Sequence, residues 1–112
     1  MKMFIHGEER DSRDSAVIEV VNPYNGKLLD TVPAATREDV TECITWAVEG
    51  QKTWNQKNIR EKSEVLKKFV GLVKEKREDL ARLLTMETGK PIGDSYGEVD
   101  ELCYIFEGSI EV

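Results

Sequence analysis

The chain has 112 residues and a mass of 12.8 kDa, a size that suits one domain and leaves no room for two hydrophobic cores. Apolar residues make up 39% and charged residues 34% of the sequence, which is the composition of a folded chain rather than a disordered one. The formal net charge of −6 argues against nucleic acids and anionic membranes as partners, because both select basic surfaces.

Location and cysteine usage point to an ordinary intracellular protein. No stretch approaches the ~18 consecutive apolar residues of a membrane span, and the first residues turn polar too early for a secretory signal. We therefore expect a cytoplasmic protein. Cys43 and Cys103 lie far apart in helical patterns and lack metal-site spacing, so both are interpreted as reduced core thiols.

The first third of the chain has the pattern of strands. Residues 3–5 predict a short strand that runs into a turn, and the polar run 8–15 predicts a loop. Residues 16–21 are rich in β-branched side chains and predict a second strand. Asn22–Gly26 contains Asn-Pro and Asn-Gly, which favour a tight connection to a third strand over 27–32 that the following proline ends. One hairpin preceded by one short strand is the expectation.

From Thr36 the apolar period becomes helical. Thr36 and Asp39 have the spacing of a capping box at a helix start. An apolar stripe then predicts an amphipathic helix that ends near residues 50–54: Val40, Cys43, Ile44, Ala47 and Val48. Residues 59–76 predict a second helix. Residues 78–87 predict a third or a continuation of the second, which Gly89 and Pro91 end, and a last helix is predicted from about Ser95.

These elements predict an α+β fold, with strands and a hairpin over residues 1–33 and three to four amphipathic helices over 36–112. A lone two-stranded hairpin is marginally stable, and helices with wide apolar stripes need a partner layer. The stripe also runs to residues 108–112 without a stop signal. We therefore expect a piece of a larger protein, with a complete small α+β protein as the alternative.

Several segments in register carry a resemblance to a known family. They are Phe4–Glu8, Val20–Lys27 and Val32–Val40, then Trp54 with Arg60 and Leu66, and finally Glu87–Pro91 with Gly97–Asp100. In this order and spacing they resemble the opening of the aldehyde dehydrogenase superfamily, over essentially the whole chain. Among its subfamilies, the lactaldehyde, glyceraldehyde-3-phosphate and succinate-semialdehyde dehydrogenases of archaea and bacteria are the most similar.

The resemblance implies the N-terminal part of an α/β NAD(P)-binding domain in an enzyme that oxidises an aldehyde to an acid. In that family a cysteine forms a thiohemiacetal, hydride passes to NAD or NADP, and a thioester is hydrolysed. The family's nucleophile, general base, oxyanion asparagine and cofactor motifs do not occur here, and neither Cys43 nor Cys103 has the nucleophile's context. The resemblance therefore implies no catalytic or cofactor-binding residue in this chain, which alone should be inactive and bind neither cofactor tightly. The implied partners are the remainder of the enzyme chain, an aldehyde substrate and further copies in a homo-oligomer.

Two groups of site residues follow from the resemblance. In relatives a monovalent cation is held beside the first hairpin, and the matching positions are the backbone carbonyls of Val20 and Val21 and the carboxylate of Glu87. Oxygen ligands suit such a hard ion. The alternative is that Glu87 is a solvated or salt-bridged residue near a helix end, since the family residue is often Asp.

The last helix is the other region with an implied role. Gly97, Glu101 and Tyr104 match a part of the family that approaches the mouth of the substrate tunnel. The alternative is that its aromatic residues serve packing. Lys90 lacks the glycine-rich loop of a phosphate site, and the single histidine, His6, has no acidic or nucleophilic partner nearby in sequence, so neither is expected to do chemistry.

A hypothesis of a different class is a non-catalytic helical module that pairs through its exposed apolar stripes with another copy or another chain. A split or frameshifted gene is a third. Sedimentation separates the second hypothesis from the first, and the nucleotide sequence beyond codon 112 decides the third.

Overall fold

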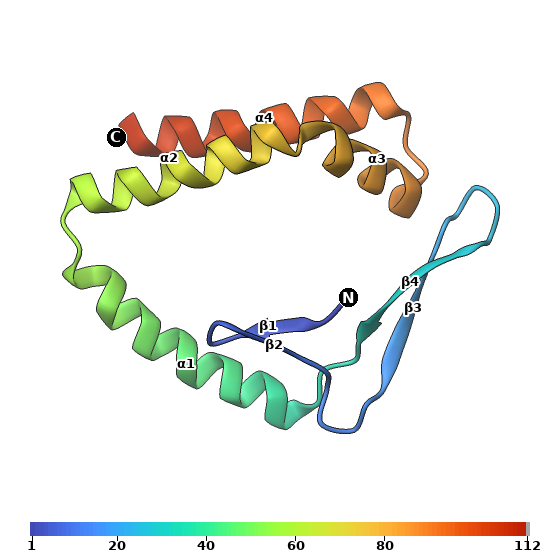
Figure 1. The fold of residues 1–112 in the computed structure, drawn as a ribbon, viewed down its shortest axis with the longest axis horizontal. Coiled ribbons are helices and arrows are strands. Elements are labelled where there is room, and N and C mark those ends of the chain that lie inside the picture. Colours follow the sequence, from blue (N-terminus) through green and yellow to red (C-terminus); the bar gives the residue numbers. More distant parts are fainter. Residues whose placement is uncertain (112) are drawn as a thin grey trace. The chain divides into compact units, whose positions relative to one another are not determined.

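The computed structural model describes residues 1–111 and divides the chain into two compact units. One unit consists of Met1–Val21 and Lys27–Gln56, and the other consists of Asn22–Gly26 and the chain from Lys57 on. Within the described residues there are four strands and four helices, which confirms the α+β class (Figure 1). Each unit is described by itself below.

The first hairpin pairs β1 (Met3–Ile5) with β2 (Glu8–Arg10), antiparallel, with Met3 opposite Arg10. His6 and Gly7 both have positive φ angles, 54° and 81°, which is the backbone of a two-residue type I′ turn. The prediction of a loop over residues 8–15 is therefore wrong for its first three residues. Those residues are charged, so they carry no β-branched signal, and only the turn marks the hairpin.

The second hairpin pairs β3 (Val17–Val21) with β4 (Leu28–Pro33), as predicted within a residue or two. In the connecting turn, the N–H of Gly26 donates to the Asn22 carbonyl at 2.7 Å, and Asn22 Oδ1 accepts from the N–H of Tyr24 at 2.9 Å. Pro33 is the last paired residue of β4, opposite Val17, rather than a stop before it. An edge position tolerates its missing N–H.

The first helix, α1 (Arg37–Gln56), starts with the predicted capping pair. The N–H of Asp39 donates to Thr36 Oγ1 at 3.1 Å, and the Thr36 N–H donates to Asp39 Oδ2 at 3.0 Å. The helix runs beyond the predicted end at 50–54. Cys43 is exposed, so its interpretation as a core thiol is wrong, and Val40 and Ile44 on the same stripe remain 48% and 60% exposed.

Three helices make up most of the second unit: α2 (Ile59–Glu75), α3 (Arg77–Thr88) and α4 (Ile92–Glu111). Asn58 starts α2 with a capping box. The Asn58 side chain accepts from the Glu61 N–H at 3.0 Å, and Glu61 Oε2 accepts from the Asn58 N–H at 2.8 Å. Lys76 leaves helical geometry, so the third helix is separate from the second.

The end of α3 agrees with the prediction, and the start of α4 differs from it. Gly89 ends α3 with φ 75°, the left-handed cap predicted for it. The last helix begins three residues before the predicted Ser95, because the Pro91 carbonyl accepts from the N–H groups of Asp94 and Ser95 and starts the first turn there. The predicted helical region reached residue 112, which lies outside the described residues.

The core of the second unit lies where α4 packs against α2 and α3 (Figure 1). Its buried side chains are Val70, Val73, Ala81, Val99 and Cys103. Arg77 of α3 reaches α4 with two hydrogen bonds to Asp100, at 2.6 and 2.7 Å, and its guanidinium lies over the Tyr96 ring, 4.4 Å from the centroid. Cys103 thus occupies the core as predicted. No helix within residues 1–111 has the length and apolarity that crossing a bilayer needs.

Candidate functional site

The two predicted carbonyl ligands, Val20 and Val21, lie at an irregularity of the second hairpin. Val20 is opposite Asp30 and Val21 is opposite Leu28, so one residue of β4 is skipped between these pairs. The unpaired extra residue is Leu29, so the backbone groups displaced from the regular ladder belong to β4 and not to Val20 or Val21.

The third predicted ligand, Glu87, lies in the last turn of α3 and is exposed. A carboxylate is unfavourable there, because the C-terminal end of a helix carries partial negative charge. The last turn of α3 contains no basic residue, and the nearby Lys90 is paired with Glu98. The end of α3 is thus a locally negative position that would favour a cation.

These three residues belong to different units, with Val20 and Val21 in the first and Glu87 in the second. The predicted cation site therefore stays a prediction. Among residues 1–110, whose side chains the structure describes, no cluster of three or more His, Cys, Asp or Glu side chains could hold a metal ion. That finding concerns side-chain ligands and does not test a site built largely from backbone carbonyls.

The predicted tunnel-mouth residues share one face of α4. Gly97, Glu101 and Tyr104 are spaced by four and three residues, all three are exposed, and Tyr104 is 76% exposed. The core residues Val99 and Cys103 lie on the opposite side of the helix. Within the described residues the three therefore lie together on an exposed surface, whereas Phe106 of the same helix packs against the core, as the packing alternative expects for it.

An apolar groove between α3 and α4 was not predicted. It has a volume of about 400 Å³, and its lining combines apolar side chains with two carboxylates: Leu80, Leu83, Leu84, Val99 and Leu102, with Glu87 and Glu98. We call it the α3–α4 groove. The sequence shows the stripe of leucines on α3. The spacing of these leucines does not show that Leu80 and Leu83 stay partly exposed next to the core.

A network of charges at the start of α1 was also missed. Arg10 Nη1 donates to Glu42 Oε1 at 3.0 Å and the Arg13 guanidinium pairs with the other Glu42 oxygen, so these hydrogen bonds, led by Arg10, lower the Glu42 pKa to about 2. Asp39 is 1% exposed. Burial alone would raise its pKa, but hydrogen bonds from Thr36 and Arg13 outweigh burial and lower it. This network fixes the N-terminal loop on α1.

The turn of the second hairpin makes one close contact within the second unit. A Cβ added to Gly89 would lie 3.0 Å from Cγ of Pro23. Pro23 and Gly89 were each predicted for their backbone geometry only. The contact explains a second requirement at position 89, namely the absence of a side chain.

Comparisons with known proteins match this chain to one family. The sequence profile of the aldehyde dehydrogenase family matches residues 10–112. A mutant betaine aldehyde dehydrogenase from Staphylococcus aureus, solved with NAD+, is similar with a TM-score of 0.94 and 29% identity, over 98% of this chain and 22% of that chain. A 3,6-anhydro-L-galactose dehydrogenase solved with NADP has a TM-score of 0.94 and 30% identity, over 98% and 23% of the two chains.

A third solved structure, an NADP-dependent enzyme from E. coli, has a TM-score of 0.95 and 31% identity, over 98% of this chain and 23% of that chain. The chain thus spans less than a quarter of the length of these relatives, 22–23%.

Proposed function

We propose that this chain, which belongs to the aldehyde dehydrogenase family, acts as the N-terminal part of an enzyme that oxidises an aldehyde to a carboxylic acid with NAD or NADP. The observation that carries the proposal is the family match over residues 10–112, together with TM-scores of 0.94–0.95 to the solved relatives. Two of those relatives were solved with NAD+ or NADP, which supports a nicotinamide cofactor in the whole enzyme.

In this proposal the chain supplies structure rather than chemistry. Covalent catalysis needs a nucleophile, a base and oxyanion donors that are held in a fixed geometry relative to one another. Cys103 lies in the core, where an aldehyde cannot reach it, and Cys43 lies beside apolar residues of α1. The reacting groups and the cofactor loop would come from the remainder of the enzyme, and these residues would form part of its NAD(P)-binding domain.

The proposal includes a monovalent cation held by the Val20 and Val21 carbonyls and by Glu87. The negative end of α3 at Glu87 supports it. Carbonyl and carboxylate oxygens suit Na⁺ or K⁺. The ion would offset the unfavourable position of the Glu87 carboxylate, so its role would be structural.

Substrate choice would be influenced by the exposed face of α4. Gly97 leaves room there, while Glu101 and Tyr104 present a carboxylate and a phenol. We further propose a cytoplasmic location and a homo-oligomeric enzyme.

A chimera tests the proposed function. The segment of the S. aureus betaine aldehyde dehydrogenase that matches this chain is replaced by this chain, and NADH formation with betaine aldehyde is followed at the absorbance of the reduced cofactor. We expect the chimera to be active, the relative without its segment to be inactive, and this chain alone to be inactive. A soluble, folded chimera without activity, or turnover by the chain alone, would contradict the proposal.

A further inference from the structure

The connection between β3 and β4 contains a chemically labile pair of residues, Asn25 and Gly26. Asparagine is among the residues that degrade with heat and time. The reaction is fastest before glycine, because the backbone nitrogen of the next residue must reach the side-chain carbonyl carbon, and a Cβ on that residue hinders the approach. The other asparagines, Asn22, Asn55 and Asn58, precede proline, glutamine and isoleucine. Asn25 is therefore the asparagine that the sequence makes most reactive.

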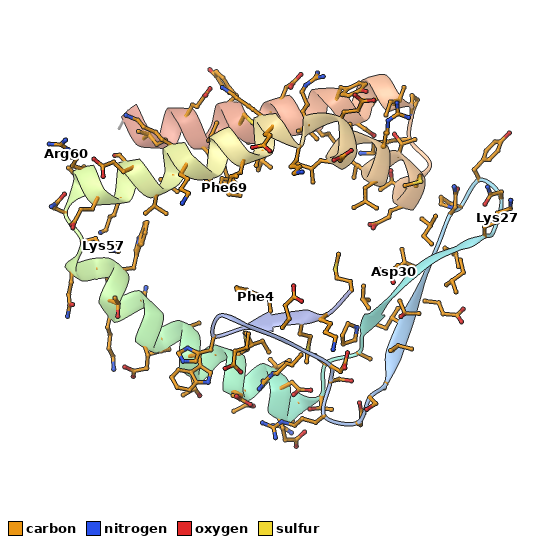
Figure 2. The ribbon with its side chains drawn as sticks, in the orientation of Figure 1. Phe4, Lys27, Asp30, Lys57, Arg60 and Phe69 are labelled. Atoms are coloured by element: carbon orange, nitrogen blue, oxygen red, sulfur yellow. The ribbon has the colours of Figure 1, made fainter. Side chains whose placement is uncertain are left out.

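The pair lies at the tip of the second hairpin, directly before Lys27 (Figure 2). Asn25 and Gly26 are both exposed, and the preceding Tyr24 is 91% exposed. Beyond the neighbours of Gly26 in the chain, a Cβ added to this residue would have no described atom within 4 Å. Water and hydroxide therefore reach the pair in the folded chain.

Hydrogen bonds of the turn hold back the nitrogen that would react. The Gly26 N–H donates to the Asn22 carbonyl at 2.7 Å, and the Asn25 N–H donates to the same oxygen at 3.3 Å. The Asn22 side chain also stabilises the turn, because its Oδ1 accepts from the N–H of Tyr24 at 2.9 Å. The Gly26 nitrogen must leave its acceptor before it can lose its proton and turn toward the Asn25 side chain. The reaction therefore requires a local opening of the turn.

We propose that Asn25 is a site of spontaneous covalent modification, converted to aspartate and isoaspartate at a rate that the hydrogen bond from Gly26 to Asn22 limits. An exposed turn held by few backbone hydrogen bonds is one of the least stable parts of a fold, so it opens while the remainder stays folded. One such hydrogen bond is enough to slow the reaction about five- to tenfold. The inference concerns this chain itself and does not depend on the enzyme role proposed above.

The modification consumes water and releases ammonia in two steps. In the first step the Gly26 nitrogen gives its proton to hydroxide and bonds to Cγ of Asn25. The bond from Cγ to the side-chain nitrogen breaks, and this nitrogen takes a proton from water and leaves as ammonia. The product is a succinimide ring. In the second step water adds to one of the two ring carbonyl carbons, and the bond from that carbon to the Gly26 nitrogen breaks. Opening at Cγ gives aspartate, and opening at the backbone carbonyl gives isoaspartate.

The two products affect the turn differently. Both add a negative charge, but aspartate leaves the path of the backbone unchanged. In isoaspartate the main chain runs through Cβ and is longer by one methylene group, so the Gly26 N–H no longer meets the Asn22 carbonyl in the same geometry. Pro23 lies in this turn, and its Cγ is 3.0 Å from the position of a Cβ added to Gly89. Isoaspartate would therefore also disturb the packing of the turn against the end of α3.

Peptide mapping by mass spectrometry tests the site. The whole chain is incubated at mildly alkaline pH, once folded and once in guanidinium chloride, and the peptide that contains Asn25 is followed over time. We expect two heavier products of equal mass that chromatography separates, while Asn55 and Asn58 stay intact. The folded chain should react at least about fivefold more slowly than the unfolded chain. Equal rates, or a folded chain with Asn25 intact after about a hundred half-lives of the unfolded chain, would overturn the proposal.

Two substitutions at Asn22 test the control by the turn. Asn22→Ala removes the side-chain acceptor of the Tyr24 N–H, whereas Asn22→Asp keeps one. In the folded chain, which circular dichroism checks, Asn22→Ala should speed the conversion of Asn25 about fivefold and Asn22→Asp should change it less than about twofold. In guanidinium chloride both variants should react as the unaltered chain does. Asn25→Gln should remain unmodified, because its longer side chain would have to close a larger ring. Equal rates for the two folded Asn22 variants would overturn the proposal.

Discussion

Replacing Gly89 with alanine separates two demands that the structure makes at one position. Gly89 has a φ of 75° and its added Cβ would lie 3.0 Å from Cγ of Pro23. Gly26 has a similar φ of 69° but nothing within 4 Å of an added Cβ. Gly26→Ala is therefore a matched control that carries the backbone strain without the close contact.

The expected magnitudes follow from these two observations. A left-handed backbone costs a residue with a Cβ about 1–2 kcal/mol, and the less flexible unfolded chain returns about 0.5 kcal/mol. Gly26→Ala should thus lower the free energy of unfolding by about 1 kcal/mol. Gly89→Ala should lower it by about 2–3 kcal/mol, because Pro23 or the cap must also shift.

Urea denaturation followed by circular dichroism measures these differences, at a concentration where the chain is monomeric. A double-mutant cycle with Pro23→Ala isolates the contact, because the alanine variant lacks the Cγ that clashes. The cycle should recover about 1 kcal/mol in the double variant. Equal losses for Gly89→Ala and Gly26→Ala, or a cycle without coupling, would show that the Pro23 contact imposes no constraint.

Three further outcomes are expected. The Glu42 pKa of about 2 lies below its ordinary value of 4.5, so the stability that Glu42 contributes is complete above pH 4.5 and is lost as the pH falls toward 2. Glu42→Gln should flatten this part of the stability–pH curve, and an unchanged curve would refute the stabilising role of Glu42. Cys43 should react at once with a thiol reagent and Cys103 only after unfolding, whereas two equally fast thiols would contradict the described core. Asn58→Ala should cost about 1 kcal/mol in urea denaturation and Asn58→Asp much less, because only alanine removes the capping acceptor; equal costs would argue against the cap.

Features that depend on neighbours in sequence were predictable. The capping pair of Thr36 and Asp39 and the left-handed end at Gly89 both follow from contacts within a few residues. Residues 8–10 were not predictable as a strand, since their pairing rests on the His6-Gly7 turn and not on their own propensity. Patterns among residues close in sequence therefore predicted most helix starts and ends but did not predict the strand β2.

Burial was harder to predict than secondary structure. The α1 stripe was correctly periodic, yet Cys43 is exposed, because a period shows which residues share a face and not whether another layer covers that face. The same limit applies to the site. The sequence related Gly97, Glu101 and Tyr104 only through the family resemblance, and α4 then placed them on one exposed face. The contact between Pro23 and Gly89 joins distant positions and left no local signal.

The buried Asp39 limits how well α1 can be studied as an isolated peptide. Its carboxylate accepts from Thr36, three residues away, and also from the N–H of Arg13, 26 residues away, at 3.2 Å. A peptide of the helix alone would keep the first donor and lose the second. Its first turn should then fray, and the carboxylate should titrate closer to that of a free aspartate. The start of α1 is in this sense a discontinuous element, completed by a loop that is synthesised before the helix.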